Sequence, residues 1–382
     1  MGNNKHTMKP EKEKRGGRYR FVKILTIVLS VILGVLLIGG GVMAIGVYRL
    51  LNGMQEGPTT TLDAAQQQSL IDAMNEEDQA DPEDLEGLDE ADEIDHTGVK
   101  EVEAEEGVFN FLLLGLDTRS EEELEKGRTD VNMIVTLDTK NHSIKLTSLM
   151  RDILLPIEGH DKNRLNTINV FLGADALVET VEKYTGIPIE GYVKVNFSCV
   201  ASIVDILGGV DMELSSGEVY QTNLGVKEQN AVDKVNSESS LLKGNGGQYH
   251  LNGKQAVAYM RIRHLAGGEF VRTSRQRKVI SQVMDDMKDI SLSDAMQLVT
   301  QITPYMKTNL SSNDIIKYAT MLYNLRDATV EDLNIPVEGA YKSVRYKGMA
   351  VFQIDFDKNA EIIQNFIFGD GSLVPKEEGD DE

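Results

Sequence analysis

Five arginines and a glutamine crowd one short window of a chain whose formal net charge is −22. They are Arg261, Arg263, Arg272, Arg275, Gln276 and Arg277. Guanidinium groups are planar forks that match phosphate oxygens two at a time, and clustered cations repel one another unless an anion lies among them. The alternative is a solvated basic face paired with carboxylates. The window therefore raises the hypothesis of a phosphate-binding site.

The spacing within this window adds a second argument. Arg272, Arg275 and Gln276 follow an i, i+3, i+4 pattern, so they share one face at the start of a helix predicted over residues 273–288. Anions are stabilised at a helix amino terminus, whereas cations there are electrostatically misplaced. A bound phosphate would explain their position, and a stray basic turn is the alternative.

Three pairs of an acidic and a basic residue stand at the ends of predicted strands. They are Asp117 with Arg119 after residues 108–115, Arg128 with Asp130 before residues 131–137, and Arg151 with Asp152 after residues 143–149. One such pair alone is typical of a surface salt bridge, which contributes little to stability. Three pairs at strand ends, together with the arginine window, favour a shared site. Two aspartates with phosphate oxygens suit a hard divalent cation such as Mg²⁺.

The composition disfavours other classes of catalyst. The six histidines show no metal-binding spacing, and the sequence has neither a nucleophile elbow nor a Walker-type glycine loop. The single cysteine, Cys199, excludes an intramolecular disulfide, and its apolar surroundings predict a buried core thiol. The acidic balance disfavours nucleic-acid binding.

The chain opens with a basic segment, residues 1–23, followed by an uncharged apolar run at residues 24–47. This run is long enough for a helix to cross about 30 Å of hydrocarbon. Positive residues before it predict a cytoplasmic amino terminus, with everything after it outside. The alternative is a cleaved signal peptide, for which the apolar run is too long. We therefore expect one transmembrane helix that acts as a signal-anchor.

Composition changes twice more along the chain. Residues 48–107 are rich in Asp, Glu and Gln and poor in large apolar residues, which predicts an extended, disordered extracellular linker. The acidic residues 371–382 are predicted to be a disordered tail. Folding signals occupy residues 108–370, so this stretch is the predicted domain.

Strand and helix patterns alternate through residues 108–370. The predicted strands cover residues 108–115, 131–137, 143–149, 191–196, 210–214, 330–335, 344–346 and 349–354. The predicted helices cover residues 169–184, 197–207, 252–262, 273–288, 293–303, 313–325 and 357–368. This order predicts a layered α/β/α domain with a central mixed sheet. The polar, glycine-rich residues 215–250 are predicted to be an exposed insertion or lid.

Nine short motifs follow one another through the domain. They are LGLDTR at 114–119, GRTD at 127–130, SLMRD at 148–152, NTIN at 166–169, YVKVNF at 192–197, DILGGV at 205–210, LNG at 251–253, AYMRIR at 258–263 and RTSRQR at 272–277. In this order they resemble the LytR-CpsA-Psr family of bacterial envelope proteins, over roughly residues 108–370. The basic tail, single membrane helix and outside domain agree with that resemblance.

The resemblance implies a phosphotransferase that moves an anionic glycopolymer, such as teichoic acid or capsular polysaccharide, from an undecaprenyl-pyrophosphate carrier to peptidoglycan. It implies Mg²⁺ or Mn²⁺ bound by Asp117 and Asp130. It also implies that the pyrophosphate is surrounded by Arg119, Arg128, Arg151, Arg261, Arg263, Arg272, Arg275 and Gln276. Apolar helices, including residues 197–207, would line a groove for the polyprenyl chain.

The chemistry of the residues is compatible with this activity. Displacement at phosphorus needs positioning and charge neutralisation, which Arg151, Arg272 and a divalent cation would supply. A carboxylate, either Asp130 or Asp152, would take the proton of the attacking hydroxyl. The implied location is the cell membrane of a Gram-positive-type bacterium. Two alternatives stay open: hydrolysis of the polyprenyl pyrophosphate, and a non-catalytic module that senses the envelope, of the kind labelled a transcriptional attenuator.

Overall fold

The structure is a computed structural model, and it describes most of the residues from 51 to 374. The described residues are 51–55, 64–77, 79–80, 85–94, 99–116, 127–157, 159–234, 240–262, 265, 275, 278–279, 282, 301–325, 328–369 and 371–374. The predicted basic tail and membrane helix, residues 1–47, lie outside them. Among the described helices, none has the length and apolar character needed to cross a membrane.

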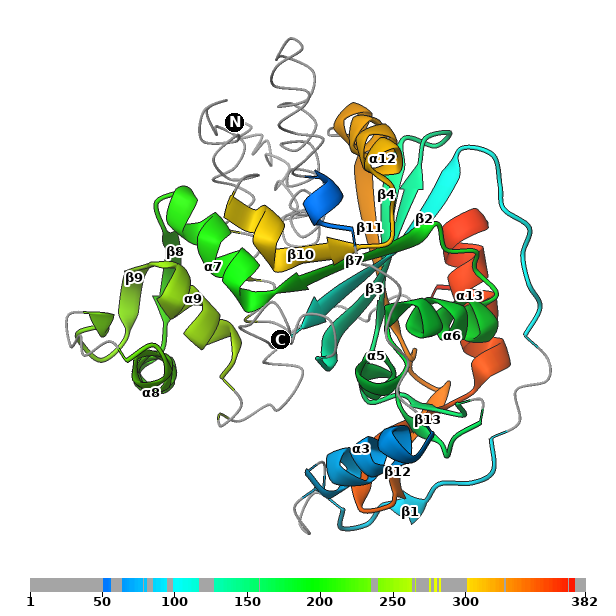
Figure 1. Ribbon diagram of the computed structural model, residues 1–382, viewed down its shortest axis with the longest axis horizontal. Helices are drawn as coiled ribbons and strands as arrows, with labels where there is room; N and C mark the ends of the chain where they lie inside the picture. The colour runs from blue at the N-terminus through cyan, green and yellow to red at the C-terminus, as the bar shows by residue number, and fades with distance from the viewer. Residues whose placement is uncertain are drawn as a thin grey trace, which may run out of the picture.

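A six-stranded mixed sheet forms the centre of the domain, in the order β10-β7-β2-β3-β4-β11 (Figure 1). Its strands are β2 (Val108–Leu116), β3 (Thr129–Asp138), β4 (Ser143–Leu149), β7 (Gly191–Asn196), β10 (Met306–Thr308) and β11 (Thr329–Ile335). β2 runs parallel to β7 and β4 runs parallel to β11, whereas β3 is antiparallel to both β2 and β4. The predicted mixed sheet is confirmed.

Helices cover both faces of this sheet, as Figure 1 shows. One face packs against α5 (Ile168–Phe171), α6 (Ala174–Thr185) and α13 (Phe356–Phe368). The other packs against α7 (Phe197–Ile206), α9 (Gly253–Met260) and α12 (Ser312–Asn324). Successive strand residues point to opposite faces, so Phe111 enters one core and Leu112 the other. The central strands are therefore buried on both sides, and the layered α/β/α prediction is confirmed.

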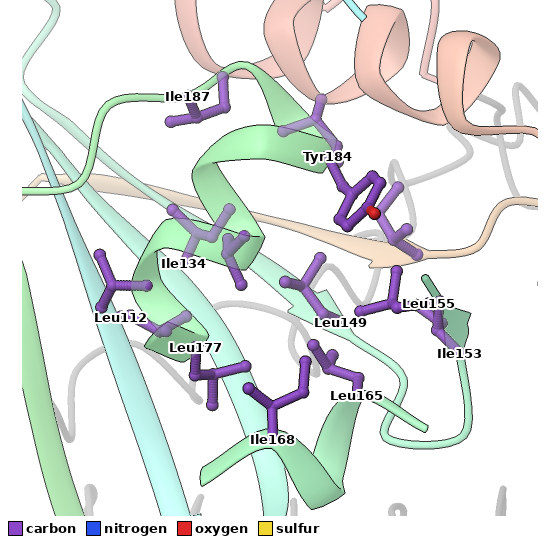
Figure 2. Packing of buried hydrophobic residues seen from close by; sticks show 14 of the residues in the cluster. Leu112, Ile134, Leu149, Ile153, Leu155, Leu165, Ile168, Leu177, Tyr184 and Ile187 are labelled. Atoms are coloured by element: carbon purple, nitrogen blue, oxygen red, sulfur yellow. The ribbon is translucent and has the colours of Figure 1, made fainter. Parts of the chain in front are cut away.

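The core on the α6 face reaches the end of β4, where the Arg151–Asp152 pair follows. Figure 2 shows Leu149 and Ile153, which flank this pair, packed beside Leu165 and Ile168. All four side chains are buried, at 7% exposure or less. Apolar anchors on both sides thus hold the intervening charged turn at the surface of the core.

Residues 215–250, predicted to be an exposed insertion or lid, differ from that prediction. The helix α8 (Ser216–Val232) starts with a capping box between Ser215 and Glu218, and β9 (Gly247–Leu251) pairs with β8 (Val210–Leu214). Because α8 carries few large apolar residues, its apolar pattern was too weak to predict a helix from the sequence. Val219, Thr222 and Val226 nevertheless lie inward at helical spacing and are buried.

The predicted linker, residues 48–107, also differs from expectation in its described parts. Leu51 and Met54 are buried in one core, and Ile71 of α3 (Ala64–Glu77) is buried in the other. The strand β1 (Asp89–Glu90) pairs with β12 (Tyr341–Tyr346), which in turn pairs with β13 (Met349–Ile354). Sparse apolar anchors and backbone hydrogen bonds hold this acidic stretch against the domain, so here charge is a poor guide to disorder.

The predicted helix over residues 169–184 is divided into α5 and α6. Gly173 has φ of 87° and ψ of 174°, a conformation open mainly to glycine that interrupts the helix, and the left-handed Gly186 ends α6 as predicted. Of the helix predicted over residues 273–288, the described residues 275, 278, 279 and 282 are helical. Most of the helix predicted over 293–303, and most of the tail 371–382, lie outside the described residues.

Candidate active site

Two of the three predicted pairs of charged residues, Arg128 with Asp130 and Arg151 with Asp152, lie at one edge of the sheet. Because β2, β4, β7 and β11 run in the same direction, their carboxyl ends lie together, next to the amino end of β3. Leu116 at the end of β2 lies opposite Asn196 at the end of β7 and Thr129 at the start of β3. Asp130 and Arg151 therefore come to the same edge from opposite strand ends.

Arg151 lies at the centre of an ion-paired cluster. Its Nη1 is 2.6 Å from Oδ1 of Asp130, and its Nε is 3.4 Å from Oδ2 of Asp152. The three side chains are only 11–20% exposed. Coulomb interactions are stronger in this partly buried environment than at the surface. The cluster thus holds a guanidinium in a defined orientation at the edge of the sheet.

Arg164 was not among the predicted site residues. It lies on β6 (Asn163–Arg164), paired with β5 (Leu154–Leu155), and its Nη1 is 3.0 Å from Oδ1 of Asp152. Asp152 thus contacts guanidiniums through both carboxylate oxygens. The sequence did contain a signal for Arg164, because this charged residue stands two positions before the NTIN motif.

The backbone around Arg151 is fixed by three separate elements. The Met150 amide donates to the carbonyl of Ile335 at the end of β11, and the Phe352 amide of β13 donates to the carbonyl of Asp152. The amide of Asn166 donates to the carbonyl of Arg151 at 3.2 Å. The short turn is therefore positioned by distant parts of the chain, which no local pattern could reveal.

The NTIN motif supports the site without supplying charge. Asn166 lies in η2 (Leu165–Thr167), and Asn169 in α5 donates through Nδ2 to the carbonyl of Gly127 at 2.7 Å. Gly127 directly precedes Arg128, which is partly exposed and lies just before β3. One motif thus contacts both charged segments, and its asparagines are positioning residues.

Two residues near Asp130 on β3 carry side-chain oxygens that could serve as ligands of a divalent cation. Thr129 Oγ1 and Asn132 Oδ1 are buried and have no hydrogen-bond partner within the described part of the chain. Oxygen donors of this kind suit Mg²⁺, so the donor chemistry fits. Asp117, the other predicted ligand, lies outside the described residues, although it directly follows Leu116. Within the described ranges, no three His, Cys, Asp or Glu residues group closely enough to hold a metal.

Arg261 reaches this edge from the other core. It is the C-cap residue of α9, and its guanidinium lies 5.6 Å from the ring centroid of Phe197, the first residue of α7. Phe197 follows Asn196, whose side chain caps α7 by accepting a hydrogen bond from the Cys199 amide. Arg261 is therefore held beside the end of β7 by a cation–π contact.

Arg275 is placed differently from our prediction. Its side chain is 5% exposed, and its Nε lies 2.9 Å from Oε1 of Glu218 on α8. A buried guanidinium with a carboxylate partner is not presented to a phosphate. Four further predicted pyrophosphate residues, like the predicted metal ligand Asp117, lie outside the described residues, so their placement remains a prediction. These are Arg119, Arg263, Arg272 and Gln276.

Lys194 is a second charged residue that our sequence reasoning did not select. It lies on β7, opposite Leu114 of β2, and is 1% exposed. Its ammonium lies 5.4 Å from the ring centroid of Tyr192. This fully buried lysine lies two residues before the end of β7, close to the site edge. The signal was present in the YVKVNF motif, where the lysine interrupts an apolar strand.

The fold and the site together define the class of protein. It is an α/β protein whose mixed sheet carries an arginine–aspartate cluster at the edge where four strands end. A model of the LytR_cpsA_psr family matches residues 65–366. The chain belongs to the LytR-CpsA-Psr family. The match starts well before residue 108, in agreement with the packing of α3 on the domain.

Similar proteins carry names that describe their activity. The polyisoprenyl-teichoic acid–peptidoglycan teichoic acid transferase TagU of Bacillus anthracis is 32% identical over 322 residues, which are 83% of this chain and 88% of that protein. The protein of the same name from Enterococcus faecalis is 31% identical over 214 residues, which are 55% of this chain and 64% of that protein.

Solved structures agree with the fold. A structure described as TagT bound to LIIa-WTA is 26% identical, with a TM-score of 0.50, and covers 72% of this chain and 96% of its own. Protein gbs0355 from Streptococcus agalactiae is 22% identical, with a TM-score of 0.54, and covers 68% of this chain and 86% of its own. The second likeness concerns the fold alone.

Proposed function

We propose that this chain is a phosphotransferase that moves a glycopolymer such as teichoic acid from a polyprenyl-pyrophosphate carrier to peptidoglycan. The relatives named as teichoic acid transferases, at 31–32% identity, support the reaction class. The observation within the chain that carries the proposal is Arg151, which is paired with two aspartates at the sheet edge. Capsular polysaccharide is a related anionic polymer and an alternative donor.

The proposed reaction is a displacement at phosphorus. A sugar hydroxyl of peptidoglycan attacks the phosphorus that carries the polymer, and the bond from that phosphorus to the polyprenyl phosphate oxygen breaks. The Arg151 guanidinium neutralises charge on the phosphoryl oxygens, with Arg128 and Arg261 approaching from neighbouring segments. The products are a phosphodiester to peptidoglycan and the polyprenyl phosphate.

The two aspartates next to Arg151 have different surroundings, which suggests different roles. Asp152 contacts Arg151 and Arg164 through separate oxygens, so we assign it to holding these guanidiniums. We assign Asp130 to the reacting groups, either as the acceptor of the hydroxyl proton or as a ligand of the cation. Mg²⁺, or Mn²⁺, bound by Asp130 together with Asp117 would supply further charge neutralisation.

We propose that residues 24–47 anchor the protein in the cell membrane, with the domain outside the cytoplasm. The length of this apolar run and the basic residues before it support the anchor. Residues 51–55 add a geometric argument, because the Thr308 amide of β10 donates to the carbonyl of Met54. Four peptide units from residue 47 to residue 51 span at most about 14 Å. The domain would thus lie close to the bilayer that contains its lipid donor.

Transfer is tested with the full chain in lipid vesicles that contain a polyprenyl-pyrophosphate glycopolymer, supplied with peptidoglycan and Mg²⁺. Arg151→Ala is expected to lower the rate of polymer attachment by about 100-fold or more, because a preorganised cation is lost. Lys140→Ala serves as the control, since it removes an exposed ion pair with Glu105. The control should leave the rate unchanged.

Two results would contradict the proposal in different ways. Full activity of a folded Arg151→Ala variant would remove the role given to Arg151. Release of free polymer phosphate by the unaltered chain, with no attachment to peptidoglycan, would show hydrolysis in place of transfer.

A chelator such as EDTA should abolish attachment, and restored activity with Mg²⁺ or Mn²⁺ would identify the metal.

A further inference from the structure

Arg275 stands in the arginine window, yet its guanidinium is directed into the protein. Nε donates to Oε1 of Glu218 at 2.9 Å, and Nη1 donates to the carbonyl of Ile262 at 3.5 Å. The residue as a whole is 4% exposed. Any phosphate would have to displace the partly buried Glu218 carboxylate to reach it, which is unfavourable because that carboxylate would lose its charged partner.

Glu218 uses its two carboxylate oxygens for two separate tasks. Oε2 accepts hydrogen bonds from the amide and the hydroxyl of Ser215, both at 2.9 Å, and so completes the capping box that starts α8. Oε1 accepts the hydrogen bond of Arg275. Burial alone would raise the pKa of Glu218, but the hydrogen bonds from Ser215 and Arg275 outweigh it and lower the pKa. Glu218 is therefore charged at neutral pH.

The second contact of Arg275 leads to the other half of the arginine window. Ile262 lies between Arg261 and Arg263, just past the end of α9. Arg275 therefore links its own helix to the backbone between two other predicted phosphate-binding arginines. Tyr259 is fully buried nearby, and burial and then the Glu218 charge raise the pKa of its hydroxyl. The ion pair thus lies in a poorly solvated environment.

We propose that Arg275 is a positioning residue, bound to Glu218, that holds the backbone at Ile262 beside Arg261 and does not contact the pyrophosphate. This inference rests on the proposed function, because Arg261 would bind the carrier pyrophosphate. Of the two arginines of the window that the structure describes, Arg275 is buried and is neutralised by Glu218, whereas Arg261 is partly exposed. Arg261 keeps its charge for the ligand.

The test is a double-mutant cycle on the full chain in detergent, with inorganic pyrophosphate and Mg²⁺ as the probe in calorimetry. The variants are Glu218→Gln, Arg275→Gln and the double variant. We expect each single variant to weaken pyrophosphate binding by roughly tenfold, and the double variant to bind no worse than either, because both changes break one contact. Asp233→Asn is the matched control, since Asp233 forms an ion pair with Lys254 that joins the opposite end of α8 to α9.

If Arg275 contacted the phosphate, the affinity of Glu218→Gln for pyrophosphate would change in the opposite direction. If Arg275 bound the ligand, Glu218→Gln would remove a competing anion and strengthen pyrophosphate binding, and this result would overturn the proposal. A purely structural pair would lower the melting temperature and leave the affinity of the folded protein unchanged, which would overturn it as well. Equal weakening by Asp233→Asn would also contradict it, because the effect would then reflect general loosening of the two helices.

Variants that fail to fold are replaced by Glu218→Asp, which keeps the charge and shortens the side chain by one methylene. It is expected to weaken pyrophosphate binding, and unchanged binding would contradict the proposal. The unaltered chain is measured first. If it bound no pyrophosphate, the proposed function would be wrong, and the role of Arg275 that depends on it would fall as well.

Discussion

Arg151 shows how a single side chain acquires a role from its neighbours. An arginine alone is mobile, and holding it still costs side-chain entropy. Here Asp130 and Asp152 share the guanidinium, and Asn166 and Phe352 hold the backbone of the turn. Because its partners are in place before a substrate arrives, the guanidinium needs little reorganisation during a reaction. This preorganisation is what makes electrostatic stabilisation effective.

Cys199 allows a test at the scale of one atom. It is buried in α7, as its apolar surroundings predicted, and burial raises the pKa of its thiol to about 12. In the unfolded chain the thiol ionises near pH 8.5. We therefore expect no reaction of the native protein with a thiol reagent at pH 9, and rapid reaction after unfolding in urea.

The same shift has a consequence for stability. Below about pH 8.5 the thiol is neutral in both states and its ionisation does not affect folding. Above that pH the unfolded state ionises first, so the folded protein loses stability as the pH rises toward the raised native pKa. Cys199→Ala should flatten this alkaline loss, measured by urea unfolding at pH 8 and pH 10. An equally steep loss in the variant would contradict the shift.

At the scale of elements, the contact between α7 and α9 is built around Gly253. A Cβ atom at this position would overlap the carbonyl oxygen of Ala201 on α7, and the Gly253 amide donates to Oδ1 of Asp205 at 2.7 Å. Only a residue without a side chain allows the two helices to approach this closely. The DILGGV and LNG motifs are therefore two halves of one helix contact, and their function is packing.

Gly253→Ala is expected to destabilise the protein by about 1–3 kcal/mol, because backbone atoms must shift to admit the new methyl group. Chemical denaturation measures the loss. Gly53→Ala is the matched control, since no heavy atom lies within 4 Å of its Cβ position. The control should not destabilise the protein, because alanine fits the helical backbone at Gly53 without a clash. Equal stability of the two variants would contradict the close contact.

At the scale of the whole molecule, the acidic segment before residue 108 is part of the folded unit. Its described parts contribute Leu51 and Met54 to one core and Ile71 to the other, and Met74 is also buried. Further along, the Val102 amide donates to the carbonyl of Gly186. The segment thus crosses the outside of the domain and is fixed at several points. A freely extended spacer would have left these apolar groups in water.

Leu51→Ala and Ile71→Ala should each reduce the free energy of unfolding by about 2–5 kcal/mol, although both precede the predicted domain. They are 0% and 2% exposed, respectively. Leu373→Ala is the control near the other end of the chain, because Leu373 is 46% exposed. Urea unfolding of the three variants checks the expectation. A loss no larger than that of the control would show that the segment does not stabilise the domain.

Some of this protein could be derived from its sequence because the relevant signals are local. Alternating and continuous apolar patterns located β2, β3, β4 and β7, since a strand buried by a sheet shows its own burial in its residues. Charged residues at strand ends then indicated Asp130, Arg151 and Asp152, because strand direction brings such ends together. The α8 helix and the packing of the acidic segment were not predicted, because their few apolar residues form no clear pattern along the chain. The burial of these residues depends on partners that are distant in the sequence.

What the sequence determined by itself is therefore the layered sheet, the kind of charge at its edge and the family to which the motifs point. What only the tertiary structure decided is which charge meets which. Arg164 joined the cluster and Arg275 was turned away from it toward Glu218, although both are arginines near recognised motifs. The physical reason is that an ion pair depends on distance and burial across the fold, and residues 57 positions apart carry no local record of their contact.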